Sequence, residues 1–325
     1  MPRTSSSSAS RPAALHPRNR HQGRYDMAAL SSALPALRPH ITRAADGTAT
    51  IDFADPLAVK ALNSALLLQQ YGIAGWDIPP GYLCPAIPGR ADYIHTLADL
   101  LGESHNGNIP TGPQLRGLDI GTGANLVYPL LGWAEYQWQF VGAEIDVTAL
   151  DNAQRILGAN PRAGDAICLR QQAESARIFT GIVQPDEQFD FTLCNPPFHA
   201  SIATAAEANQ RKRRNLSQPS AAPESSPLNF GGRHNELAYP GGEAGFLGQM
   251  IDESASIGHQ VFWFTSLVSK AANVPALQQQ LSRLGAKDIR VMPMAQGQKR
   301  SRLLAWTFLD KKQRRAWRRA RWPNI

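Results

Sequence analysis

Three features are scarce in this 325-residue sequence, and each scarcity excludes a class of protein. Its three cysteines are far apart and include no C-x-x-C pair, which indicates a reducing compartment and neither a disulfide framework nor a structural metal site. Its longest strongly apolar stretches, 65–68 and 261–268, are far shorter than the roughly 20 residues of a membrane helix. The N-terminus has no apolar segment typical of a secretory signal. We therefore expect a cytoplasmic protein with no membrane partner and no metal.

Acidic residues are missing from three segments that carry much of the positive charge. Residues 1–24 hold five arginines, 211–214 hold four basic residues and 311–322 hold seven. The formal net charge is +7, but without these sixteen residues the rest has 17 basic against 26 acidic side chains. An acidic body with basic appendages indicates either solvated tails or binding to a polyanion such as nucleic acid.

The remaining composition is that of a folded protein of about two domains. Apolar residues make up 43%, and the mean hydropathy is −0.30. We predict a disordered tail at 1–15, a helical N-terminal domain at 16–110, an α/β domain at 111–310 with a mobile insertion at 203–227, and a basic tail at 311–325. Helices are expected near 56–67 and 92–101, with a Pro/Gly-rich loop at 78–90 between them.

After residue 111, short apolar strands alternate with helical segments, which indicates βαβ units on a mostly parallel sheet of about seven strands. The predicted strands are 117–120, 140–145, 167–171, 189–194, 261–267, 289–294 and 303–309.

A glycine-rich turn follows the first of these strands. The sequence GLDIGTGANL places Asp119 at the strand end and Gly121 and Gly123 in the turn before a helix. It lacks the third glycine of the dinucleotide fingerprint, because position 126 is Leu. The D-x-G-x-G pattern instead matches the turn with which methyltransferases bind S-adenosylmethionine. Glu144 ends the next strand, 23 residues after Gly121. An acidic residue that binds the ribose of the cofactor is expected at this position, and Asp146 is the alternative. Taken singly, Asp119 fits a strand-end cap better and Glu144 an exposed edge carboxylate. Taken together, on consecutive strands, they favour a cofactor site.

The strand FDFTLC ends at an Asn-Pro-Pro-Phe corner, residues 195–198. Pro196 and Pro197 cannot continue a ladder, so they force a rigid, extended turn at the carboxyl end of the sheet. The Asn195 side-chain oxygen and the Pro196 carbonyl could then accept both hydrogens of an aromatic amine such as adenine N6, while Phe198 stacks on the base. The plainer alternative is a strand end with Asn195 as a turn residue.

With their flanking blocks, these motifs resemble the bacterial 23S ribosomal RNA (adenine-1618-N6)-methyltransferase family, which is related to eukaryotic enzymes that methylate adenines in RNA hairpins. The resemblance extends from about residue 16 to 310 and includes HPRNRHQGRYD, GYLCPAIPGRADYIH, LDIGTGANLVYPLLG, CNPPFHAS, LNFGGRHNEL and MAQGQKRSR. It implies a Rossmann-like class I S-adenosylmethionine-dependent fold behind a small helical RNA-binding domain. It also implies that the substrate is 23S ribosomal RNA or a large-subunit assembly intermediate. A monomer is expected.

The resemblance implies further site residues. Arg90 matches an arginine near the cofactor carboxylate, Asn125 belongs to the cofactor turn, and Gln171 and Gln172 match the region near the cofactor adenine. RNA contacts are expected from the arm at 16–26, the basic insertion and the 299–302 segment. The residues expected to bind RNA are Arg18, Arg20, Arg24, Arg211, Lys212, Arg213, Arg214, Lys299 and Arg300. In the tail, Trp317 and Trp322 either stack on RNA or pack on the body.

Three alternatives share parts of this pattern. A DNA adenine-N6 methyltransferase has the same corner chemistry. A protein-glutamine N5 methyltransferase shares the fold and the Asn-Pro-Pro sequence but usually has Tyr at the fourth position. A non-catalytic RNA-binding assembly factor could retain the fold, although the intact motif residues oppose this.

Overall fold

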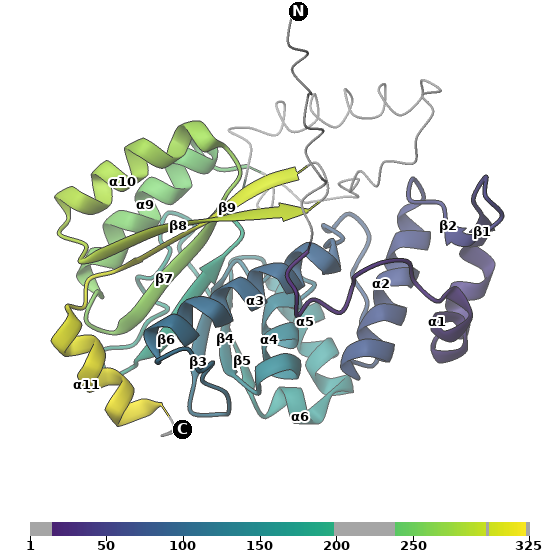
Figure 1. The fold of residues 1–325 in the computed structure, drawn as a ribbon, viewed down its shortest axis with the longest axis horizontal. Coiled ribbons are helices and arrows are strands. Elements are labelled where there is room, and N and C mark those ends of the chain that lie inside the picture. The colour runs from purple at the N-terminus through teal and green to yellow at the C-terminus, as the bar shows by residue number, and fades with distance from the viewer. Residues whose placement is uncertain (1–14, 198–237, 297–298, 323–325) are drawn as a thin grey trace, which may run out of the picture.

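The structure is a computed structural model that describes residues 15–197, 238–296 and 299–322. At its centre is a seven-stranded sheet with strand order β5-β4-β3-β6-β7-β9-β8 (Figure 1). Five strands run parallel, and β9 lies antiparallel between β7 and β8. The strands are β3 (Arg116–Ile120), β4 (Gln139–Glu144), β5 (Ile167–Gln171), β6 (Phe189–Cys194), β7 (Val261–Val268), β8 (Asp288–Gln296) and β9 (Lys299–Thr307). All seven predicted strands are present.

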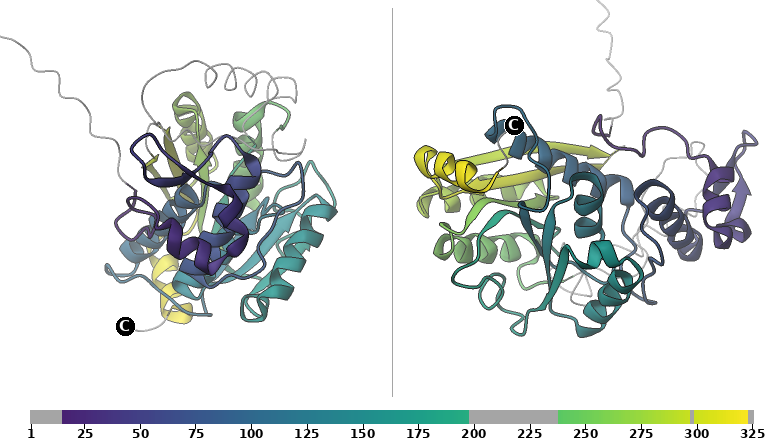
Figure 2. Two further views of the ribbon diagram at one scale, coloured as in Figure 1. Left: turned by 90° about the vertical axis from the view of Figure 1, so that its right-hand side faces the viewer. Right: turned by 90° about the horizontal axis from the view of Figure 1, so that it is seen from below.

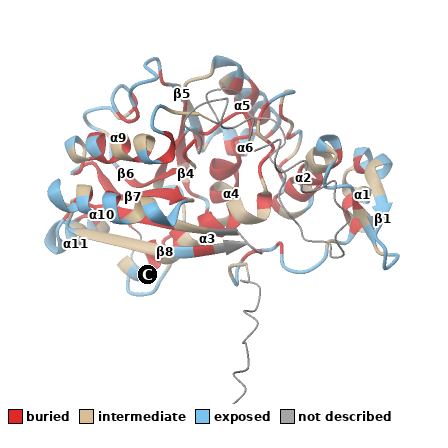
Figure 3. Cartoon of the chain, turned by 90° about the horizontal axis from the view of Figure 1, so that it is seen from above, coloured by how far each residue is buried: buried red, intermediate tan, exposed pale blue. Residues whose placement is uncertain are grey.

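Helices cover both faces of the sheet (Figures 1 and 2). One hydrophobic cluster joins the sheet to α3, α4 and α5, and a second joins it to α9 and α10. Figure 3 shows the strands as mostly buried and the outer helix faces as exposed. The helices are α3 (Ile87–Ser104), α4 (Val127–Tyr136), α5 (Val147–Ala159), α6 (Pro161–Gly164), α9 (Gly242–Ser256), the 3-10 turn η2 (Ala271–Asn273), α10 (Val274–Arg283) and α11 (Lys311–Arg321).

The N-terminal part forms a small unit at one end of the long axis (Figure 1). Its elements are α1 (Met27–Ala33), η1 (Pro35–His40), the hairpin β1 (Ile41–Arg43) and β2 (Ala49–Ile51), and α2 (Pro56–Tyr71). Leu30, Leu37 and Leu66 are buried in a cluster of its own, whereas Leu67 of α2 and Leu97 of α3 belong to the core of the sheet. The hydrophobic core thus divides within α2, earlier in the chain than the predicted boundary near residue 110.

Helix α3 begins at Ile87, inside the segment 78–90 that was expected to be a loop. That expectation is wrong at its C-terminal end because Pro88 stands in the first turn of the helix. A proline is tolerated there, since the first amides of a helix have no partner within the helix. The last proline of this segment therefore stands in the first turn of α3, whereas the earlier ones lie in the loop that precedes it.

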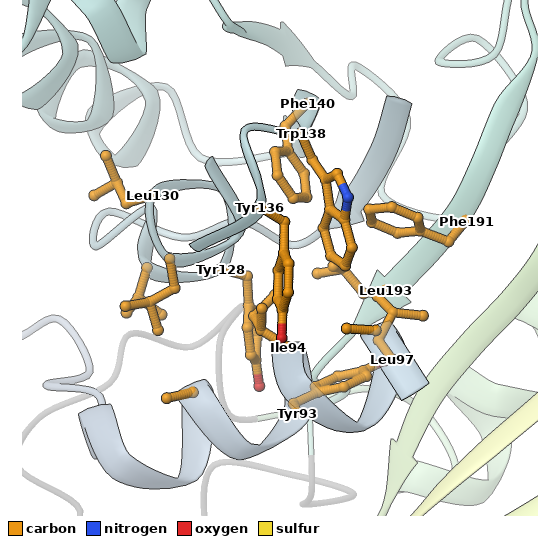
Figure 4. Packing of buried hydrophobic residues seen from close by; sticks show 14 of the residues in the cluster. Tyr93, Ile94, Leu97, Tyr128, Leu130, Tyr136, Trp138, Phe140, Phe191 and Leu193 are labelled. Carbon is orange, nitrogen blue, oxygen red and sulfur yellow. The ribbon is translucent and has the colours of Figure 1, made fainter. Parts of the chain in front are cut away.

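Aromatic side chains fill the space between α3, α4 and the sheet (Figure 4). Trp138 stacks on Tyr136 with ring centroids 4.6 Å apart and contacts Phe191 of β6 at 4.8 Å. Its indole nitrogen donates to the Pro110 carbonyl, so the polar edge of this buried ring is satisfied. These rings hold α3 against β3 and β6, the two strands that border the site described next.

Candidate functional site

A pocket of about 400 Å³ opens at the carboxyl ends of β3, β4 and β6. Strand order reverses between β3 and β6, and this is where open α/β sheets place their ligands. The walls come from the turn at 120–128, the end of β4, the segment 172–178, the corner at 194–197 and residues 238–246 at the start of α9. Parts of both halves of the chain therefore meet at one cavity of the size that small cofactors occupy.

The glycine turn forms the floor of this pocket. Gly121 and Gly123 both have positive φ, +70° and +67°, a conformation that glycine adopts without strain. A Cβ on Gly121 would meet no atom within 4 Å, so that face of the turn is open. The turn is fixed from below by its Gly121 and Thr122 amides, which donate to the Ala143 carbonyl of β4 at 2.9 and 3.0 Å. The sequence thus builds a backbone surface that a ligand can approach closely.

Glu144 lies at the rim of this surface, and its carboxylate is held by backbone amides. It accepts hydrogen bonds from the amides of Gly123 at 2.9 Å, Ile145 at 2.8 Å and Asp146 at 3.1 Å. Burial nevertheless raises the pKa of this carboxyl above its ordinary value. Asp146, the alternative in the sequence prediction, instead caps α5 through the Thr148 amide at 2.8 Å.

Asp119 is completely buried beneath the turn. Within the part of the chain that the structure describes, neither of its carboxylate oxygens has a hydrogen-bond partner. Burial raises the pKa of Asp119 to about 7. The nearby Thr122 hydroxyl opposes this rise without making a well-formed hydrogen bond, the Glu144 carboxylate adds to it, and Arg90 opposes it. Asp119 is not itself in the pocket lining, but the next three residues, Ile120, Gly121 and Thr122, are. An unsatisfied buried carboxylate is costly to the fold, and a cationic partner would offset that cost.

Arg90 joins the cofactor side of the pocket to the corner after β6. Its guanidinium donates to the Tyr128 hydroxyl at 3.0 Å and to Asn195 Oδ1 at 3.3 Å, and it lies over the Tyr128 ring at 5.4 Å. All three residues line the pocket. Tyr128 was absent from the predictions, although it lies in the YPLLG part of the cofactor motif.

The corner itself is anchored by buried hydroxyl groups. Tyr93 of α3 accepts a hydrogen bond from the Cys194 amide at 3.2 Å and contacts the Thr265 hydroxyl at 2.9 Å. Thr265 donates to the Thr192 carbonyl at 2.6 Å. These contacts fix the strand end just before Asn195. Sequence reasoning missed Tyr93 and Thr265, because their partners come from elements about 100 and 73 residues away.

The predicted site residues do not all reach the cavity. Asn125, Asn195 and Pro197 line it, but Asp119 and Pro196 do not, and Phe198 lies outside the described residues. Gln171 is exposed and is not in the lining. Its neighbour Gln172 is buried, lines the pocket and donates to the Thr180 carbonyl at 2.9 Å. Adjacent residues of a strand end face opposite ways, which accounts for the difference.

The predicted RNA-binding residues are distributed over several places. Arg18 donates to Asp99 at 2.7 Å and to Tyr136 at 3.1 Å, and Arg20 pairs with Glu135 at 2.8 Å. The side chain of Arg24 is 76% exposed and pairs with Asp46. The backbones of Lys299 and Arg300 begin β9, and residues 211–214 lie outside the described chain. The arm at 16–26 therefore packs on the body through Arg18 and Arg20.

The tail tryptophans are settled by the structure. Trp317 and Trp322 are buried, and both indole nitrogens donate to Asp190 Oδ1 at 2.7 Å. They pack on the body, so the alternative in which they stack on RNA is wrong. Among the described residues, no cluster of histidine, cysteine or acidic side chains could hold a metal, and no helix has the length and apolarity needed to span a membrane.

Comparison with known proteins agrees with this geometry. A family described as "RNA methyltransferase" matches residues 9–310. Ribosomal RNA large subunit methyltransferase F of Pseudomonas aeruginosa is 59% identical over 308 residues, covering 95% of this chain and 92% of that protein. The protein of the same name from Methylobacillus flagellatus is 52% identical over 324 residues, covering 96% of both.

Solved structures give the same result. The catalytic domain of hMettl16 in complex with the MAT2A 3'UTR hairpin 6 has a TM-score of 0.75 at 30% identity, covering 92% of this chain and 99% of that one. The N-terminal domain of human METTL16 in complex with SAH has a TM-score of 0.71 at 27% identity, with coverages of 91% and 99%. The predicted fold class, enzyme class and S-adenosylmethionine cofactor are confirmed. This chain belongs to the RNA methyltransferase family.

Proposed function

We propose that this protein methylates the N6 amino group of an adenine in large-subunit ribosomal RNA, as its resemblance to the 23S adenine-N6 family implies. The observation that carries the proposal is the position of Asn195. It leaves a buried strand at a proline corner and lines the same pocket as the glycine turn and Glu144. A target base and a methyl donor can therefore be held in one cavity.

The residues around the glycine turn fit S-adenosylmethionine. The open face of Gly121 admits a ligand against the backbone, and the unsatisfied carboxylate of Asp119 suits a cationic group such as an amino-acid ammonium. Arg90 supplies a guanidinium fork for a carboxylate. Glu144 and Asn125 would complete the site on the ribose side. The cofactor, when bound, supplies a methyl group on a positively charged sulfur.

Asn195 would act on the other reactant. Its side-chain oxygen can accept a hydrogen bond from the amino group of adenine. Without such a contact, the lone pair of the amino nitrogen is delocalised into the adenine ring. Arg90, which donates to that same oxygen at 3.3 Å, fixes which way the amide faces. Holding the amine in one orientation is worth more than acid–base help here, since the product sheds its proton afterwards. Pro197 keeps the corner rigid beneath it.

The RNA-binding part of the proposal is carried by Arg24, whose side chain is more exposed than those of Arg18 and Arg20 in the same arm. Arg24 is largely exposed, and its partner Asp46 has a half-exposed side chain, so an RNA phosphate can replace that carboxylate. Arg18 and Arg20 instead position the arm, because they are tied to α3, α4 and the end of α2. A base must leave its stack to reach Asn195, which costs a few kcal/mol in a duplex and less in a loop.

The test is to incubate the protein with labelled S-adenosylmethionine and unmodified ribosomal RNA, and to map the modified nucleosides by mass spectrometry. We expect N6-methyladenosine at one large-subunit position. Asn195→Ala should lower the rate by about 100-fold or more, by analogy with the loss of one positioned hydrogen-bond group elsewhere. Asn108→Ala, which truncates an exposed asparagine outside the pocket, is the matched control.

Other outcomes separate the alternatives. Methylation of DNA adenine or of a protein glutamine, with none on RNA, would reject the proposed substrate while keeping the cofactor site. A protein that binds ribosomal RNA and S-adenosylhomocysteine but methylates nothing would support an assembly factor. Full activity of Asn195→Ala would remove Asn195 from the reaction.

A further inference from the structure

The C-terminal helix α11 is anchored to the body by one buried carboxylate. Asp190, the second residue of β6, is fully buried. It accepts hydrogen bonds from the indoles of Trp317 and Trp322, each at 2.7 Å, and pairs with Arg321 at 3.2 Å. The helix starts with a capping box between Asp310 and Gln313. Its position on the body is therefore fixed by specific contacts, and its basic side chains are not part of a loose tail.

The outward side of this helix carries cations that have no acidic partner in the described chain. Of its seven basic residues, Arg314 pairs with Asp288 at 3.0 Å and Arg321 pairs with Asp190. The other five make no ion pair among the described residues: Lys311, Lys312, Arg315, Arg318 and Arg319. Such like charges at helical spacing destabilise a helix in isolation.

Three of these arginines converge on a hollow. Arg315, Arg318 and Arg319 line it together with His105 and Asn106, which follow the end of α3. Its volume is about 270 Å³. Arg318 is held at its edge by donating to the Ser104 carbonyl, and burial and the neighbouring arginines lower its pKa. Arg315 and Arg319 remain exposed. A concave site lined by guanidinium groups matches the bidentate geometry of phosphate oxygens.

This hollow lies far from the methylation site. Asp190 is near the beginning of β6 and Asn195 directly follows its end, so about 16 Å of strand separates them. Figures 1 and 2 place α11 and the unit formed by α1, η1 and β1–β2 at opposite ends of the long axis. A ligand of the pocket alone would not reach α11.

We propose that the arginine face of α11, formed by Arg315, Arg318 and Arg319, is a second RNA-contact surface that binds backbone phosphates of the RNA being methylated. The inference rests on the proposed function and narrows its substrate class to a folded RNA that extends from the pocket to the amino-terminal edge of the sheet. Because Trp317 and Trp322 are buried, this surface offers charge without base stacking, so its contribution is independent of RNA sequence.

The experiment compares a double variant, Arg315→Gln with Arg319→Gln, to a matched control, Arg162→Gln with Arg283→Gln. The control also removes two exposed arginines from helix ends, but neither lines the hollow or the pocket. Binding of a large-subunit ribosomal RNA fragment is measured over a range of salt concentrations. Each lost phosphate contact lowers the slope of log affinity against log salt by about 0.7–0.9.

We expect the slope of log affinity against log salt to fall for the α11 variant by an amount that corresponds to up to two lost phosphate contacts. We also expect this variant to bind RNA about tenfold more weakly at 0.15 M salt. Its KM for RNA should rise with little change in kcat, while the control stays close to the wild type. Circular dichroism and tryptophan fluorescence verify that α11 remains docked.

Equal salt slopes for the α11 variant and the control would overturn the inference. The inference would also be overturned if the α11 variant lost binding to anionic lipid vesicles but bound RNA as the wild type does. That result would identify the arginine face of α11 as a membrane contact. Failure of the proposed function is separate. If the wild type methylates no ribosomal RNA but its salt-dependent RNA binding still requires Arg315 and Arg319, the second RNA-contact surface is supported and the proposed methylation reaction is rejected.

Discussion

Two buried carboxylates lie at the glycine turn: Glu144 lines the pocket, and Asp119 lies beneath the turn, outside the lining. Glu144 accepts three backbone amides, whereas Asp119 has no hydrogen-bond partner within the described residues. Leaving a buried carboxylate unsatisfied costs the folded protein free energy. Such a cost is common where a group is reserved for a ligand. Asp119 is therefore the residue at which stability and cofactor binding should oppose each other.

Replacing Asp119 by Asn should stabilise the cofactor-free protein and weaken S-adenosylmethionine binding. The raised pKa, about 7, means that the folded state is destabilised as pH rises from about 4 through 7, and Asn cannot ionise. At pH 8 we expect a melting temperature higher by about 2 °C or more. Affinity should fall at least about tenfold, through loss of a charge-assisted hydrogen bond.

Thermal unfolding and titration calorimetry measure the two effects. Asp165→Asn, the same change at an exposed aspartate, should alter neither. A lower melting temperature for Asp119→Asn with unchanged affinity would contradict the assignment.

At the scale of elements, α11 depends on a carboxylate that belongs to a distant strand. Asp190 accepts from Trp317, Arg321 and Trp322 of the C-terminal segment and from the Arg116 amide of β3. Its removal would therefore leave two indole N–H groups, one guanidinium and one backbone amide without this partner. Replacing Asp190 by Ala should destabilise the protein by about 3 kcal/mol, as expected when one partner of a buried charged pair is removed.

Urea unfolding followed by tryptophan fluorescence checks this prediction. Asp186→Ala, at an exposed site in the loop before β6, should change stability little. If Asp190→Ala unfolds at the wild-type urea concentration, Asp190 does not anchor α11.

The N-terminal arm is held to the body by buried histidines. His21 of the arm contacts the Tyr71 hydroxyl at 2.9 Å. His95 of α3 contacts the Tyr136 hydroxyl at 2.7 Å and stacks on the ring of His16 in the arm, with ring centroids 5.3 Å apart. Burial lowers the pKa of each histidine to about 4. The positive charge of Arg20 lowers the pKa of His21 further. The pKa of His95 is lowered further by His16, Arg18 and Arg20 and is raised by Asp99. Between pH 6.5 and 4 the unfolded chain binds the extra protons, so this stabilisation is lost as the pH falls.

A variant carrying His21→Gln and His95→Gln should therefore depend less on pH than the wild type. Between pH 7 and 5 we expect the wild type to lose about 3 kcal/mol more stability than the double variant, because each histidine contributes somewhat less than about 2 kcal/mol to that loss. Urea midpoints at the two pH values measure it, and comparing the two proteins cancels the opposite contribution of Asp119. The exposed His259→Gln serves as control. Parallel pH profiles for the wild type and the double variant would refute the role of these histidines.

At the scale of the whole molecule, the pocket depends on both halves of the sheet. Its glycine turn and Glu144 come from the β3–β4 half, and Asn195, Tyr239 and Phe246 come from the β6–β7 half. Segments that are far apart in the sequence thus build one cavity, at the point where the strand order reverses between β3 and β6. The N-terminal unit of α1, η1 and β1–β2 contributes nothing to its lining.

Amide exchange should report this arrangement. S-adenosylhomocysteine should slow exchange by about tenfold or more at 121–128 and at 238–246 together, because a bound ligand stabilises every element that it closes upon. Exchange in α1 and β1–β2 should not change. Protection of the first segment alone would show that the two halves do not form a single site.

The sequence by itself determined the elements and the chemistry of the site. Short apolar runs that end near Asp119, Glu144 and Asn195 predict strands whose carboxyl ends meet at one edge of a sheet, because parallel strands share direction. Local rules of glycine and proline suffice for the turn at 121–123 and the corner at 195–197. These signals are local, so they can be read without the fold.

Only the tertiary structure decided how distant side chains pair. It placed Arg90 on Asn195, seated Tyr93 under the corner, put Gln172 rather than Gln171 in the pocket, and buried Trp317 and Trp322 on Asp190. These contacts join residues up to 132 positions apart, and no periodicity specifies them. Whether a polar side chain is free or satisfied depends on what packs against it, and that is fixed only when the whole chain has folded.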